Sequence, residues 1–140
     1  MKFENKLGKT MYISPTERMK VIHLWMGNTA LDEKTYYEYF EQEEKISHFG
    51  RNIGLDEEYD EDMIGILPIF EKPVTVQEVL QKKVPIDISS ISAAIKAAGQ
   101  AGINTVNAVF YITDSSITVK EPHQADYNGL SYIGAFKSAL

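Results

Sequence analysis

The apolar positions from Val21 onward fall first into a strand-like run and then into a helical spacing. Residues 21–26 (VIHLWM) are rich in β-branched and aromatic side chains, and Gly27-Asn28 closes the run with turn residues, which predicts a central strand. Thr29 and Asp32 resemble a helix-capping pair and predict a helix over about 31–44. The apolar stripe of that helix consists of Tyr36, Tyr39 and Phe40.

The next segment combines a short helical pattern with a longer apolar run. Apolar residues spaced by three and four over 46–54 predict a second helix, with Ser47 as its cap and Gly54 as its stop. Residues 63–70 predict a buried strand. Because Pro68 removes one backbone donor, we expect that strand to lie at a sheet edge or to end there.

The second half of the chain predicts two more helices and two or three strands. A capping box opens a helix over 75–83, and a second helix covers 88–98. Residues 105–113 are apolar on both faces, which is typical of an interior strand. A turn then leads into a strand at 117–119, and 130–136 predicts a last strand.

These elements predict a single α+β domain. We expect a mixed β-sheet of about four or five strands packed by about four helices, as a single pair of layers. A length of 140 residues suits one hydrophobic core. Residues 1–20 have only scattered apolar positions and are interpreted as an N-terminal arm or edge element, with the domain over 21–140.

The amino-acid composition excludes several classes of protein. Hydrophobic residues make up 44% of the chain, as in a globular protein, and its longest apolar run, 63–70, is far shorter than a membrane span. There is no cysteine, which excludes disulfides and thiolate metal sites. With no signal-like apolar core at the start, a cytoplasmic location is expected.

Charge is distributed very unevenly. Residues 29–71 contain 13 acidic and three basic side chains, whereas the whole chain has a net charge of −6. Such a negative region attracts basic partners and repels a nucleic-acid backbone. Only two arginines are present, Arg18 and Arg51, so direct nucleic-acid binding is not predicted.

No catalytic or cofactor motif stands out. The three histidines are dispersed, and counting from Asp56 places Leu67 where a calcium-binding EF-hand loop needs glutamate. There is no glycine-rich phosphate loop and no nucleophile elbow. We therefore expect no enzyme and no cofactor. Aromatic residues interleaved with acidic ones, in 36–41 and around Tyr59, are instead typical of a protein interface.

The ordered motifs resemble the immunity protein 22 family of bacterial polymorphic toxin systems. That resemblance covers about 21–110, with Met63 at a position where the family usually has an aromatic. It rests on Trp25, Gly27, Tyr39, Phe40, Ser47, Phe49, Tyr59, Asp60 and Asp62. It implies a protein that binds and neutralises a cognate toxin, often one that attacks nucleic acid.

The acidic residues define the predicted toxin-facing surface, with Asp60 and Asp62 as the leading charged contacts. Trp25, Tyr39 and Phe40 are assigned to the core, whereas Tyr37 and Tyr59 are expected to be free to face a partner. The predicted partner-binding residues are Tyr37, Glu38, Glu41, Asp56, Glu57, Glu58, Tyr59, Asp60, Glu61 and Asp62.

Two alternatives stay open at this point. One is a metal-binding regulator or small enzyme that uses Asp60, Asp62 and His48. The other is a self-associating structural subunit that pairs through the 63–70 strand at a sheet edge. A monomer is favoured, with neither nucleic acid nor membrane as a direct partner.

Overall fold

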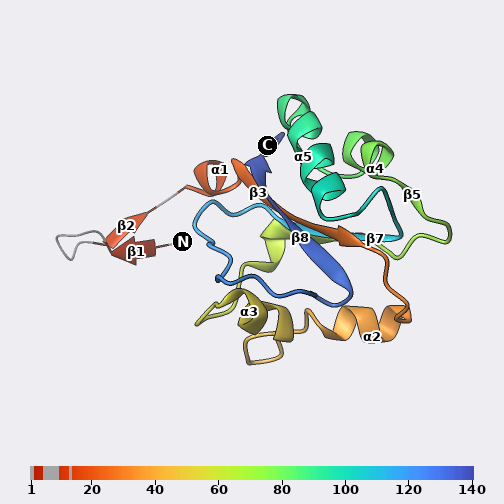
Figure 1. Cartoon of the computed structure of the whole chain (residues 1–140). Helices are drawn as coiled ribbons and strands as arrows, with labels where there is room; N and C mark the ends of the chain where they lie inside the picture. Colours follow the sequence, from red (N-terminus) through yellow and green to blue (C-terminus); the bar gives the residue numbers. More distant parts are fainter. Residues whose placement is uncertain (1, 5–9, 13) are drawn as a thin grey trace.

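A four-stranded sheet forms the centre of the molecule (Figure 1). The computed structural model describes residues 2–4, 10–12 and 14–140. The strand order is β4-β7-β3-β8, and every neighbouring pair is antiparallel. The strands are β3 (Val21–Gly27), β4 (Ile64–Ile66), β7 (Ala108–Ile112) and β8 (Leu130–Lys137).

Alternating residues of the central strand β3 contribute to two separate cores. Ile22, Leu24 and Met26 point to one face, which α4 (Val76–Lys82) and α5 (Ile88–Gln100) cover. Trp25 points to the other face and stacks on Phe110 of β7 at 5.0 Å between ring centroids. Short helices and a long loop cover that second face: α2 (Glu33–Glu38), α3 (His48–Ile53) and residues 113–129.

The remaining elements are small. A 3-10 turn, η1 (Glu61–Met63), leads into β4. The strands β5 (Val74–Thr75) and β6 (Thr105–Val106) pair in a sheet of their own, as do β1 (Lys2–Glu4) and β2 (Thr10–Tyr12). The helix α1 (Pro15–Arg18) precedes β3. At positions 1, 5–9 and 13 the predicted arm falls outside the described residues.

The α+β class is confirmed, and the central strand, the short helix with its Ser47 cap and Gly54 stop, and the helices at 75–83 and 88–98 are all present. The mixed sheet in a single pair of layers was wrong in detail. All neighbouring pairs of the central sheet are antiparallel, although long connections that include α2, α3, α4 and α5 join its strands, and both faces of the sheet are covered.

Two predicted elements are shorter than the sequence indicated, and a third is absent. The helix predicted over 31–44 is limited to α2, which Asp32 and not Thr29 caps: the Asp32 carboxylate accepts from the Thr35 N–H at 2.8 Å. The predicted strand at 63–70 is only β4, which lies at the sheet edge as expected. Residues 117–119 form a loop and not a strand, although the side chains of Ile117 and Val119 are buried.

Candidate functional site

The acidic loop, defined as residues 56–62, lies between α3 and β4 and ends within η1. Most of its carboxylates project into solvent. Tyr59 is the buried residue of the loop, and Asp60 is half-buried. The exposed ones are Asp56, Glu57, Glu58, Glu61 and Asp62. The loop therefore concentrates negative charge on a surface that water reaches.

Tyr59 anchors this loop to the segment that follows α2. Its side chain is 5% exposed, and its hydroxyl donates to the Phe40 carbonyl at 2.7 Å. The Gln42 side chain bonds both backbone groups of Tyr59, accepting from its N–H at 2.9 Å and donating to its carbonyl at 3.1 Å. Burial raises the pKa of the Tyr59 phenol to about 12 and so keeps it a neutral donor. The prediction that Tyr59 faces a partner was wrong, since its ring belongs to the core.

Asp60 and Asp62 differ in their surroundings. One Asp60 oxygen accepts from the Asp62 N–H at 2.9 Å, and the other lies 3.8 Å from the Arg18 guanidinium. That guanidinium is buried and also donates to the fully buried Asp114 at 3.2 Å. Asp60 is thus partly neutralised from within, with 40% of its side-chain surface exposed, whereas Asp62 is exposed.

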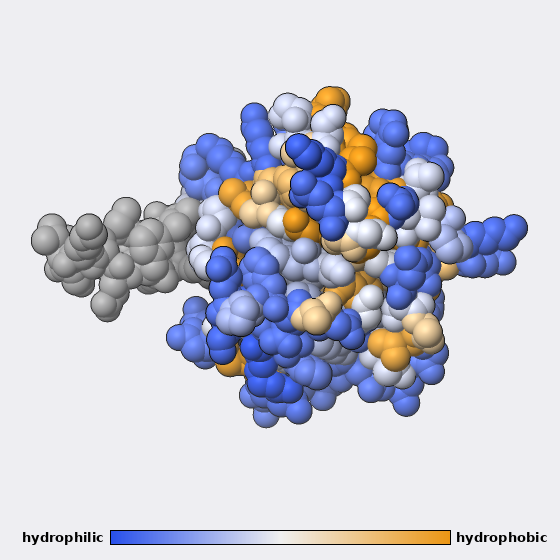
Figure 2. Space-filling view, viewed as in Figure 1, coloured by the Kyte–Doolittle hydropathy of each residue, from blue (hydrophilic) through white to orange (hydrophobic). Residues whose placement is uncertain are grey.

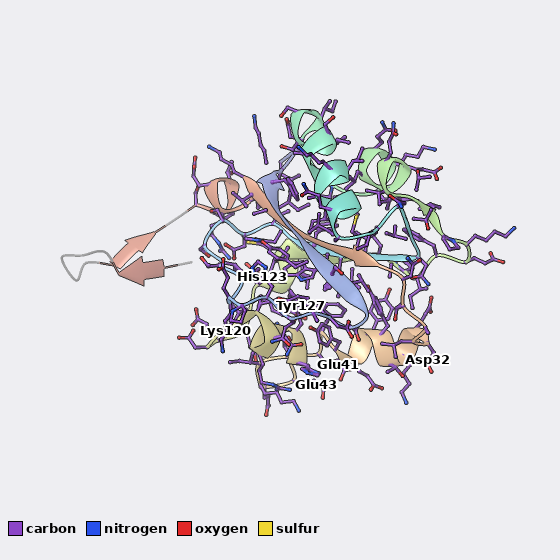
Figure 3. All side chains as sticks on the ribbon, viewed as in Figure 1. Asp32, Glu41, Glu43, Lys120, His123 and Tyr127 are labelled. Atoms are coloured by element: carbon purple, nitrogen blue, oxygen red, sulfur yellow. The ribbon has the colours of Figure 1, made fainter. Side chains whose placement is uncertain are left out.

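The second part of the predicted surface comes from α2 and the residues after it. Glu38 and Glu41 are exposed, and Tyr37 is half-buried, where desolvation raises the pKa of its phenol. Figure 3 shows Glu41 and Glu43 on the segment that links α2 to α3, below the loop that carries His123 and Tyr127. The Tyr59 contacts place the acidic loop beside this segment.

We name the acidic face as the exposed carboxylates of both parts together with the half-buried Tyr37. Figure 2 shows a mainly hydrophilic surface over α3, whereas hydrophobic patches gather around α5. The acidic face consists of Tyr37, Glu38, Glu41, Asp56, Glu57, Glu58, Glu61 and Asp62, with Asp60 at its inner edge.

A cleft of about 890 Å³ adjoins the acidic face at Glu38. Its walls come from residues 28–31, α2, α3 and residues 124–129. Sequence reasoning missed this cleft because its walls join segments almost 100 residues apart, and no local motif signals that meeting. Polar residues at 28 and at 124–128 were the only available signal.

The predicted metal ligands do not come together. Within residues 2–4, 10–12 and 14–140, no group of three or more histidine and carboxylate side chains is placed to hold a metal ion. His48 lies in the cleft, with its ring 5.1 Å from that of Tyr39, whereas Asp60 turns toward Arg18. None of the described helices is both long and apolar enough to cross a membrane.

Comparison with known proteins gives one match. The model of a family described as immunity protein 22 matches residues 22–138, which is most of the chain. No curated protein and no solved structure matches. The matched range includes the acidic loop, α2 and the cleft, and it begins after Arg18.

Proposed function

The chain belongs to the immunity protein 22 family, and on that premise we propose that it binds a cognate nuclease toxin through the acidic face and blocks the toxin's substrate site. The role in toxin immunity follows from the family. The nuclease chemistry and the binding surface are parts of the proposal.

The observation that carries the proposal is the set of exposed carboxylates that lack an internal counter-ion. The described part of the chain contains four ion pairs, and Asp60 is the only acidic-loop residue in any of them. The other carboxylates of the loop take part in none of these ion pairs and are accessible to a partner. A nuclease presents a basic cleft to phosphates, so opposed carboxylates steer the encounter and mimic the substrate's charge.

In this proposal the protein acts by occupying the substrate site of the toxin and not by catalysing a reaction. An inhibitor of this kind needs a rigid, charged surface but no reactive group, and the Tyr59 and Gln42 contacts supply the rigidity. Because charge complementarity acts mainly on the association rate, we expect binding that weakens as salt concentration rises.

The test is calorimetric titration with the toxin domain encoded beside this gene, at low and moderate salt. The variant Glu58→Lys, Asp62→Lys reverses two exposed charges that take no part in those ion pairs, and it should weaken binding by about 100-fold or more. The matched control Glu71→Lys, Glu121→Lys changes the net charge equally outside the acidic face and should retain most of the affinity.

The outcomes separate the parts of the proposal. Absence of binding by the wild type would refute the immunity role for this toxin. Tight binding that ignores the Glu58 and Asp62 reversals would keep the role but move the surface elsewhere. A purified toxin that cleaves neither DNA nor RNA would refute the nuclease assignment alone.

A further inference from the structure

The cleft beside α2 has walls that the fold itself holds in place. Asn107 exchanges two 2.9 Å hydrogen bonds with the Thr29 backbone, and the Asn128 side-chain amide donates to the Tyr36 carbonyl at 2.9 Å. The Tyr39 hydroxyl donates to the Asn52 side-chain oxygen at 2.7 Å, which ties α2 to α3. These bonds connect the cleft walls to one another, so the cavity exists before any partner arrives.

Internal bonds leave several acceptor oxygens around this cleft, with the amide nitrogen of Asn52, whose oxygen accepts from Tyr39, as a donor beside them. The side-chain amide nitrogens of Asn28 and Asn128 donate to backbone carbonyls, so their oxygens remain available. Glu38 and Asp126 also line the cleft, and neither takes part in an ion pair within the described part of the chain. No lysine or arginine is among the described residues that line it.

The Glu38 and Asp126 carboxylates, with no basic side chain beside them among the described lining residues, suit a cation that donates hydrogen bonds. A guanidinium has five N–H donors and no acceptor, and it stacks favourably on aromatic rings such as that of the exposed His48, which packs 5.1 Å from the buried Tyr39 ring in the cleft wall. The volume exceeds what one side chain fills, so the cleft has room for a short loop with its backbone.

We propose that the cleft receives an arginine-bearing loop of the toxin, as a second contact region separate from the acidic loop. This inference rests on the proposed function. Residues 38–42 lie between the two regions, because Glu38 borders the cleft and Gln42 holds Tyr59 of the acidic loop. A partner that covers both regions must cross this segment.

The discriminating variant is Asp126→Asn, since Asp126 belongs to the cleft but not to the acidic face. Asparagine keeps the oxygen that accepts from the Gly129 N–H and removes one charge. Glu121→Gln is the matched control, because Glu121 is an exposed acid in the same loop outside the cleft. Calorimetry with the toxin domain should show Asp126→Asn weakened by about tenfold and Glu121→Gln changed by less than about twofold.

A second measurement locates the contact directly. In heteronuclear NMR spectra of the labelled protein, adding the toxin domain should shift the side-chain amide signals of Asn28, Asn52 and Asn128, which line the cleft. Wild-type binding with unchanged amide signals and equal affinities for both variants would overturn the cleft assignment and leave the acidic face intact. Failure of the wild type to bind would instead reject the proposed function, and the cleft assignment with it.

Discussion

Neighbouring residues of the acidic loop have opposite environments. Glu58 is exposed and without an ion pair among the described residues, whereas Tyr59 is buried and Asp60 turns toward Arg18. A single acidic run thus contains both solvent-facing charge and the anchor that holds it. The anchor works because its hydrogen-bond partners, the Phe40 carbonyl and the Gln42 side chain, lie on a different segment.

His23 is a buried titratable group on the central strand. Its Nδ1 lies 2.9 Å from the Tyr132 hydroxyl, and its Nε2 has no hydrogen-bond partner among the described residues. Burial raises the pKa of Tyr132 to about 12, so its phenol stays neutral beside the imidazole. Desolvation lowers the pKa of His23, although the nearby Asp114 carboxylate opposes that shift.

The pH dependence of stability follows from that lowered pKa. Below the unfolded-state pKa of about 6.5, the unfolded chain binds a proton that folded His23 does not, so the free energy of unfolding falls as pH falls. Urea unfolding at pH 7.5, 6.5 and 5.5 should show this loss, and His23→Gln should flatten it. Equal slopes for the two proteins would show that His23 does not set the pH dependence.

The sequence predicted which large residues form the core better than which polar residues face a partner. Trp25, Tyr39 and Phe40 are core residues as expected, because aromatic side chains at strand or helix spacing usually bury. The burial of Tyr59 could not be predicted, since its neighbours in the sequence are all acidic and its partners lie 17 to 19 residues earlier. The untested surface residues remain predictions.

At the scale of elements, capping residues determine where α3 begins and ends. Ser47 accepts from the Gly50 N–H at 2.9 Å at the start of α3, and Gly54 ends that helix in the left-handed region at φ 89°. Both ends were predictable because capping uses side chains within one turn. The end of α2 was not, because the helix stops after six residues, at Glu38, with no glycine or proline to mark the stop.

Gly54 offers a stability test with an internal control. A Cβ at Gly54 would lie 2.8 Å from the Lys120 Cβ, and the positive φ disfavours other residues, so Gly54→Ala should destabilise the protein by about 1–2 kcal/mol. At Gly99, in α5, an added Cβ meets nothing within 4 Å, so Gly99→Ala should stabilise by about 0.5–1 kcal/mol. Chemical denaturation measures both, and equal effects of the two substitutions would contradict this account.

At the scale of the whole molecule, Arg18 connects three separate regions. Its guanidinium, on α1, contacts Asp114 after β7 and approaches Asp60 in the acidic loop, and its backbone carbonyl accepts from the Ser115 N–H at 2.7 Å. Residues before the matched family range therefore take part in the fold of the matched part. No sequence pattern predicts this role, because a lone arginine among polar residues is normally at the surface.

Removing the Arg18 charge should destabilise the whole domain. The variant Arg18→Met leaves the fully buried Asp114 without its counter-ion, at an expected cost of about 3–5 kcal/mol. Lys20→Met removes an exposed charge that pairs with Glu17, and it should cost less than about 1 kcal/mol. Urea denaturation compares the two, and similar losses would mean that the Arg18 pair contributes little.

The two cores on opposite faces of one sheet have a consequence for how such proteins diversify. The contact regions proposed here belong to the face that α2, α3 and the 113–129 loop cover, whereas α4 and α5 pack on the other face through a separate set of side chains. Gene segments that encode residues 28–62 and 113–129 could therefore be exchanged between relatives while the α4–α5 layer stays constant. Lineages facing new toxins would then accumulate substitutions on one face of the sheet and retain the packing of the other.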